Sequence, residues 1–568
     1  MDFRALVDEV LADYYRHFPV TATELGMHGH DGAWPDLSDA GRAERIAFLA
    51  VAADRIAAVD PSTLSTDDRI DRRILEESLA ALHFAEDDLD EGHWNAMAYV
   101  YLFGNGLFAL LAREFAPLPD RLTSAASRLR ALPAALEQAR TNLTAPRDQR
   151  AGTGRAREVS RLHAEKAVTT MPGVAELART AASEADQLEA SDAALRDELR
   201  AAAGKAVEAV EAHIAWLQDE LVPRAAGDFR LGADLYERKF RHALRTELTP
   251  DQLEARAAAG YDQVRAEMVR LARELWPSWM GTEPLPEDEA SIVRSVLDAI
   301  AGDHPRAEEL LDWCRAENAR IEAFIRERDL IGLADEPLQI VWTPPFLRAF
   351  GGAMLIPPGP LDRGLDSFFA ITPMPDDWSD ERKESYLRED NSRMLRLLTI
   401  HEAVPGHYLQ LAWSNRCPSL VRAIFGSGVF AEGWAVYVTQ VMMEVGYGSE
   451  DPALMLTHWK FYLRSITNAL MDIRIHTGTM DEDEAMRLMV DGGFQEYGEA
   501  ANKWDRARLS STQLCEYFLG AVQLTDMEQE ARRRADANDG ELSWRPFLES
   551  LISHGSPPPP ILREILAG

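Results

Sequence analysis

Helical periodicity runs through most of the chain. Segments such as LSTDDRIDRRILEESLAALHFAED (64–87) and LRDELRAAAGKAVEAVEAHIAWLQDEL (195–221) place apolar residues at intervals of three and four among charged ones, which gives a helix one apolar face. Thr249 before Pro250, with an acidic first turn, is typical of a helix start. The pattern predicts a mainly α-helical protein, and we find no repeat of about 20 to 50 residues that would indicate a solenoid.

Residues 338–375 break the helical pattern. Three short β-prone runs, LQIVW, AMLI and SFFAIT, are separated there by proline and glycine. They predict a small antiparallel sheet immediately before the helix that carries the sequence HEAVPGH. The last run, within DSFFAIT, could hydrogen-bond an extended peptide by strand addition. The basic stretch 144–161 has little apolar periodicity and is expected to be a loop.

These patterns suggest two regions. The first is an N-terminal helical region, residues 1–235. The second, residues 236–568, contains the predicted sheet and the HEAVPGH sequence. The boundary is soft, because helices on its two sides could pack into one body.

Composition narrows the class of protein. The chain has 568 residues, 46% of them hydrophobic, and a formal net charge of -34, which disfavours nucleic acid or an anionic membrane surface as a partner. The start, MDFRALVDEVLADYYRHFPV, lacks the features of a signal peptide, and the three scattered cysteines suit a reducing compartment. We therefore expect a cytoplasmic enzyme without membrane partners, and leave open whether it forms a homodimer.

HEAVPGH begins like the zinc-protease motif HExxH. His401 and Glu402 occupy its first two positions, but Pro405 stands where the second His belongs, and the next imidazole is His407. Positions i and i+6 lie about 120° apart around a regular helix, so two such imidazoles would not face one ion. A kink or helix end at Pro405-Gly406 could turn His407 back toward His401, because proline has no amide to donate and glycine tolerates unusual backbone angles.

A third metal ligand is available downstream. Glu432 lies in the apolar helical stretch SGVFAEGWAVYVTQVMMEVG, where an unpaired carboxylate would be costly. Together His401, His407 and Glu432 would make a three-ligand zinc site with one position for water, and Glu402 would act as general base. The alternative is structural: a His-Glu pair within a helical core, and a Glu432 that pairs with a nearby basic residue.

The motifs HEAVPGHYLQ and FAEGWAVY resemble the bacterial family called domain of unknown function 885. LGADLYERKFRHALRTELTPDQLEARAAAGYDQV and DRARLSSTQLCEYFLG extend the resemblance over nearly the whole chain. It implies a zinc-dependent peptidase with a helical, gluzincin-like fold and one Zn2+ ion. The positions that the family pattern carries over are His401, His407 and Glu432 as metal ligands, Glu402 as general base, and Asp472, His476, Arg506, Gln513 and Tyr517 around them.

The surrounding positions suggest the kind of substrate. His476 or Tyr517 could stabilise a developing oxyanion, and Arg506, with Gln513 beside it, could bind a substrate carboxylate. This predicts a metallopeptidase for short peptides, of carboxypeptidase or dipeptidase type. The chain departs from the family pattern at Ala507 and at Ser511-Thr512, which bears on substrate preference. Two alternatives stay open: a zinc hydrolase of a non-peptide amide or ester, and a metal-free helical binding protein.

Overall fold

The computed structural model describes residues 2–145, 157–343, 348, 353–362, 364–375 and 378–567. These residues are mainly helical, as predicted; most of the expected loop 144–161 lies outside them. The chain divides into two compact units, Met1–Leu231 with Pro358–Leu365, and Gly232–Pro357 with Asp366–Gly568. We call 358–365 the return segment. The predicted boundary at residue 235 divides the chain only once, so it does not assign the return segment to the first unit.

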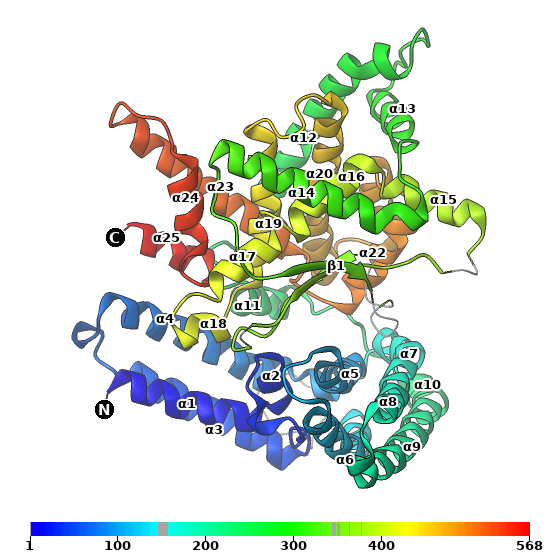
Figure 1. Ribbon diagram of the computed structural model, residues 1–568, viewed down its shortest axis with the longest axis vertical. Helices are drawn as coiled ribbons and strands as arrows, with labels where there is room; N and C mark the ends of the chain where they lie inside the picture. The colour runs from blue at the N-terminus through cyan, green and yellow to red at the C-terminus, as the bar shows by residue number, and fades with distance from the viewer. Residues whose placement is uncertain are drawn as a thin grey trace. The chain divides into compact units, whose positions relative to one another are not determined.

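Helices make up the first unit, and each can be followed by its label in Figure 1. They are α1 (Phe3–His17), α2 (Pro19–Glu24), α3 (Asp39–Ala57), α4 (Thr66–His83), α5 (Met97–Ala112), α6 (Leu118–Thr144), α7 (Arg161–Thr170), α8 (Pro172–Glu184), α9 (Ala193–Trp216) and α10 (Val222–Arg224). Side-chain caps begin several of them: the Ser65 hydroxyl accepts the amide of Asp68 at the start of α4.

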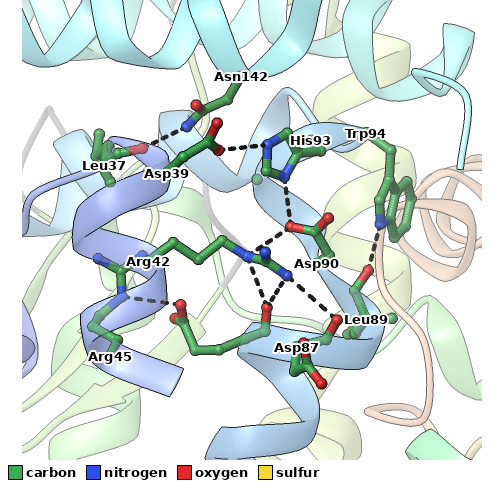
Figure 2. A network of polar contacts seen from close by, with 12 residues as sticks. Leu37, Asp39, Arg42, Arg45, Asp87, Leu89, Asp90, His93, Trp94 and Asn142 are labelled. Atoms are coloured by element: carbon green, nitrogen blue, oxygen red, sulfur yellow. Dashed lines mark hydrogen bonds and ion pairs between the residues drawn. The ribbon is translucent and has the colours of Figure 1, made fainter. Parts of the chain in front are cut away.

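A buried polar network joins α3 to the end of α4 (Figure 2). The Arg42 guanidinium donates from Nε to the carbonyl of Glu86 at 3.0 Å and lies 3.2 Å from the Asp90 carboxylate. Asp90 has φ +50° and ends the wide turn of residues 84–89 that follows α4. Nδ1 of His93 lies 2.6 Å from the same carboxylate. The arginine therefore satisfies carbonyls that the end of the helix leaves without partners.

The return segment is bound within the first unit by backbone and side-chain contacts. The Leu361 amide donates to the carbonyl of Leu25 at 2.9 Å. The His28 imidazole lies between two carboxylates, with Nδ1 3.0 Å from Asp31 and Nε2 3.0 Å from Asp362. Burial alone would lower the pKa of His28, but the hydrogen bonds that the imidazole donates to these carboxylates raise it to about 9. At neutral pH the segment is thus held by a charged imidazole.

The second unit contains the sheet and the remaining helices. The helices are α11 (Ala233–Leu244), α12 (Pro250–Trp279), α13 (Glu289–Ala301), α14 (Leu310–Arg328), α15 (Asp380–Glu389), α16 (Ser392–Glu402), α17 (His407–Ser414), α18 (Leu420–Ile424), α19 (Gly428–Glu444), α20 (Pro452–Thr477), α21 (Glu482–Met486), α22 (Tyr497–Leu509), α23 (Cys515–Asp536), α24 (Trp544–Ile552) and α25 (Pro559–Ala567). The predicted start of α12 is confirmed: Thr249 and Gln252 form a capping box before it. In its core α19 packs along α23, and α20 along α12.

The sheet has the three predicted strands but a mixed topology. The strands β1 (Leu338–Trp342), β2 (Ala353–Ile356) and β3 (Ser367–Ile371) lie in the order β1-β3-β2. β2 is antiparallel to β3, whereas β1 is parallel to it, so the expectation of a purely antiparallel sheet is wrong. The reason is that β3 inserts between the two earlier strands. Strand addition at β3 is excluded as well, because both of its edges are already paired; β2 is an edge strand.

Candidate metal centre

The helix that carries the motif is interrupted, as the Pro-Gly pair predicts. α16 ends at Glu402 and α17 begins at His407. Between them Ala403 has φ -101° and ψ -102°, outside the helical region, and the Val404–Pro405 peptide is cis. The two imidazoles are thereby released from the 120° divergence of a regular helix.

Two contacts hold the interruption in place. A Cβ atom on Gly406 would collide with the carbonyl oxygens of Ile400 and His401, so the chain can turn this tightly only with glycine there. The indole Nε1 of Trp434, in α19, donates to the carbonyl of Pro405 at 2.9 Å. The AEGWA stretch therefore supports the HEAVPGH turn as well as supplying a carboxylate.

Three predicted ligands converge on one point. The carboxylate Oε2 of Glu432 lies 3.3 Å from Nε2 of His407 and 3.8 Å from Nε2 of His401. The two imidazole rings are nearly perpendicular, with centroids 4.8 Å apart. Ligand atoms that bind zinc tetrahedrally at its usual bond lengths lie about 3.3 Å from one another. The spacing and the donor types therefore fit a single zinc ion.

The protonation states of these side chains are coupled. Burial, and then the charge of His407, lower the pKa of His401 to about 3. Burial alone would lower the pKa of His407, but the hydrogen bond and charge of Glu432 raise it. Burial alone would raise the pKa of Glu432, but His407 and His401 lower it. His401 is therefore neutral and Glu432 ionised, the states that metal ligands require.

Glu402 lies beside the three ligands. The candidate ligand atoms of His401, Glu402 and His407 lie within 4.8 Å of one another. Oε2 of Glu402 accepts the backbone amide of Leu355, in edge strand β2, at 2.9 Å. Burial chiefly, with the charge of Glu432, raises the pKa of Glu402 to about 7. This hydrogen bond fixes one carboxylate oxygen and leaves the other available for a proton.

Close packing of two helices brings α23 to the same site. A Cβ on Gly433 in α19 would collide with the backbone of Gly520 in α23, and a Cβ on Gly520 with the carbonyl of Val429. Glu516, also in α23, packs against Gly428. Burial, then the charges of Glu432 and Asp472, raise the pKa of Glu516 to about 8, so it is protonated at neutral pH.

Arg506, Gln513 and Tyr517 are brought together. Nη2 of Arg506 donates to Oε1 of Gln513 at 2.8 Å and to the hydroxyl oxygen of Tyr517 at 3.2 Å. Burial, then the charge of Glu432, raise the pKa of Tyr517 to about 12. The phenol is therefore neutral, and because its oxygen accepts from Arg506, its hydrogen can be donated elsewhere.

His476 and Asp472 hold the chain between α22 and α23. Nε2 of His476 lies 2.9 Å from the carbonyl of Ala507 and 2.7 Å from that of Ser510, and the ring stacks on Tyr236. Asp472 accepts the amides of Thr512 and Leu514 and the hydroxyl of Tyr236. This placement favours a positioning role for His476 over oxyanion stabilisation.

Sequence reasoning missed three contributors to the site: Leu355, Gly433 and Glu516. Leu355 acts through its backbone amide, which no side-chain pattern can reveal. Gly433 stands inside the AEGWA motif, and a glycine in the middle of an apolar helix is a signal of close packing. For Glu516 the only signal in the sequence is its position, one residue before Tyr517.

The fold and the site define a mainly helical protein with a candidate His-His-Glu metal centre. The chain belongs to the family described as bacterial protein of unknown function (DUF885), whose sequence pattern matches residues 19–566. A comparison with curated proteins finds no match.

Two solved structures resemble the whole chain. A protein from Shewanella oneidensis, described provisionally as a lipoprotein of unknown function, is 30% identical and has a TM-score of 0.84, with 100% of both chains covered. A protein from Colwellia psychrerythraea, also described provisionally as a lipoprotein, is 14% identical and has a TM-score of 0.79, with 100% of this chain and 98% of that chain covered. The second similarity shows the shared fold alone.

The expected cytoplasmic location is wrong, because the Shewanella oneidensis relative, 30% identical over the whole chain, is described as a lipoprotein, a class of exported or membrane-anchored proteins. The expectation relied in part on Cys314, Cys417 and Cys515. All three are free and buried, and buried thiols are inert in either compartment. Within the described part of the chain no single helix is long and apolar enough to cross a membrane. One bent pair of helical segments, Thr66–His93 with Met97–Ala112, is long and apolar enough when the two are taken together.

Proposed function

We propose that this protein is a zinc-dependent hydrolase that cleaves amide bonds of short peptides, in a gluzincin-like arrangement. The observation that carries the proposal is the convergence of His401, His407 and Glu432 with the Glu402 carboxylate beside them. Since the relative from Shewanella oneidensis is described as a lipoprotein, we infer that the substrates of this protein are met outside the cytoplasm.

The chain's own residues would divide the chemistry as follows. A zinc ion, when bound by the three ligands, would supply Lewis acidity and lower the pKa of water. The free oxygen of Glu402 would accept a proton from the attacking water and donate it to the leaving nitrogen, while Leu355 holds the other oxygen. The hydroxyl of Tyr517, polarised by Arg506, would donate to the oxygen on which negative charge develops.

Replacement of Glu402 by glutamine tests this division. Glu402→Gln should retain stoichiometric zinc, measured by elemental mass spectrometry, and lose about a hundredfold or more in kcat, because general base catalysis contributes on that order. The substrates would be dipeptides and blocked short peptides. Glu247→Gln, which changes an exposed carboxylate of the same unit, should leave both zinc content and kcat unchanged. Full activity of Glu402→Gln would rule out the proposed mechanism.

The two alternatives make different predictions. A hydrolase of non-peptide metabolites would bind zinc, leave the peptides intact and cleave N-acyl amino acids or esters. A metal-free binding protein would contain no stoichiometric zinc, and a chelator would leave its unfolding temperature unchanged. A native zinc ion should instead make that temperature fall on chelation, because a ligand that binds only the folded state stabilises it.

A further inference from the structure

Lys503 is a largely buried lysine for which no hydrogen bond is found among the described residues. The residue is 8% exposed, and its closest carboxylate oxygen, on Glu499, is 3.9 Å away. Glu499 already accepts Arg464 Nη2 at 2.6 Å. Among the described residues no other carboxylate oxygen is within ion-pairing distance of Nζ. Burying a charged group without partners is costly, so such a group usually indicates a ligand that supplies them.

Two further cations lie around Lys503. Arg506 follows it by three residues in α22 and therefore lies on the same face of the helix. Both hydrogen bonds of Arg506 start from Nη2, which leaves Nε and Nη1 available. Arg464 comes from α20. Arg464 and Lys503 thus share the carboxylate of Glu499, in a chain whose formal net charge is -34.

These cations lie within electrostatic range of the metal ligands. Burial first, and then the charge of Arg464, lower the pKa of Lys503 to about 7, while the charge of Glu432 opposes that shift. The charge of Glu432 also acts on Arg506, and that of Arg464 acts on His401. The cations and the metal ligands therefore belong to one electrostatic site.

We propose that Lys503 and Arg506 form a carboxylate-binding subsite, so that the substrate of this hydrolase carries a carboxylate close to the bond that is cleaved. This inference rests on the proposed function. The ammonium of Lys503 supplies up to three donors, and Arg506 keeps Nε and Nη1 as further single donors. The carboxylate could be the free end of a peptide or an acidic side chain, and the chemistry of recognition is the same.

Such a subsite would discriminate strongly. A substrate with the carboxylate pairs with Lys503, whereas an amide analogue does not supply that partner. Sites built around a buried polar group reject ligands that lack the matching group far more strongly than apolar pockets reject a missing methylene. The expected preference is therefore seen in kcat/KM for otherwise identical substrates.

The test uses three N-blocked dipeptides and the zinc-loaded full chain. One has a free C-terminal carboxylate, one is its amide, and the third is an amide with a glutamate side chain. The free acid, the acidic side chain or both should be cleaved with a kcat/KM about tenfold to a hundredfold above that of the neutral amide. If the free acid is preferred, the subsite binds the end of the peptide; if the glutamate peptide is preferred, it binds an acidic side chain.

Two variants test the contribution of Lys503 to substrate preference. Lys503→Met should lower kcat/KM for the preferred acid about tenfold or more, mainly through KM, and leave the neutral amide unchanged. Methionine replaces the buried ammonium with an apolar group of similar length, so folding should be retained. Arg508→Gln is the matched control: it removes a cation from the same helix whose partner is Asp505. It should change neither substrate.

A binding measurement separates this inference from the proposed function. In Glu402→Gln, calorimetry should show tighter binding of the peptide acid than of its amide, and Lys503→Met in that background should abolish the difference. Equal binding and equal cleavage of acid and amide would overturn the subsite and leave the hydrolase intact. A selective effect of Lys503 on binding, without cleavage of any substrate, would support the subsite and contradict the proposed function.

Discussion

The lack of a side chain at residue 406 decides where a metal ligand lies. Gly406 approaches the carbonyl oxygens of Ile400 and His401 so closely that a Cβ would collide with them. The tight turn between α16 and α17 depends on this approach, and His407 is the first residue after it. The position of the His407 imidazole therefore depends on Gly406, a residue that has no side chain.

Replacing this glycine should damage the centre without touching a ligand. Gly406→Ala forces the carbonyls and the added Cβ apart, and overpacking of this kind costs about 1–3 kcal/mol of unfolding free energy. We expect lower zinc stoichiometry together with a lower unfolding temperature. Gly498→Ala in α22 is the control, since nothing lies within 4 Å of a Cβ there. Native zinc content in Gly406→Ala would show that the turn does not position His407.

At the scale of elements, the contact of α19 with α23 joins the two halves of the site. Gly433 and Gly520 face each other without side chains between them, which sets Glu432 of one helix beside Glu516 and Tyr517 of the other. A larger residue at either glycine would push the helices apart. The separation of the ligand from the proposed oxyanion donor therefore depends on the packing of two helices.

Gly520→Ala should reduce stability and activity together. The new Cβ meets the carbonyl of Val429, at a cost of about 1–3 kcal/mol. We expect a fall in the unfolding temperature and a larger relative fall in kcat than in zinc content, because the three metal ligands lie on α16, α17 and α19. In Gly260→Ala the added methyl makes only ordinary contacts, at 3.4 Å and beyond, so stability should be unchanged or slightly higher. Unchanged kcat in Gly520→Ala would contradict this account.

Local patterns in the sequence predict elements well and their pairing poorly. The helix start at Thr249, the three strands and the interruption at Pro405-Gly406 depend on neighbours in the chain, and all are confirmed. The direction of β1 relative to β3 depends on which strand inserts between the others, a long-range choice that no local run encodes. The convergence of Glu432 with the two imidazoles was predictable because an apolar helix leaves few roles for a carboxylate. Lys503 was missed because a lysine among polar residues gives no sign that it is buried.

At the scale of the molecule, the return segment is held in the first unit by a titrating group. The pKa of His28 is raised from 6.5 to about 9, chiefly because the hydrogen bonds that it donates to Asp31 and Asp362 outweigh its burial. A raised folded-state pKa stabilises the fold fully below the unfolded-state value, and the contribution is lost as pH rises through the folded-state value.

The difference in unfolding free energy between the wild type and His28→Gln should therefore be largest below about pH 6.5 and shrink as the pH passes about 9. Denaturant titrations at pH 6, 8 and 10 measure it, and groups that titrate equally in both proteins cancel. His30→Gln, two residues along, is the control variant, since no carboxylate contact of His30 is found among the described residues. A difference that grows with pH would contradict the proposed charge state.

The return segment also limits recombination between related genes. The first unit is completed by residues that the gene encodes far downstream, between two strands of the other unit. An exchange of the region before residue 232 between related genes would transfer an incomplete unit, lacking the partners of Leu25 and His28. Such hybrids should succeed only when both parents carry a compatible return segment, so the two units are bound to evolve as a pair.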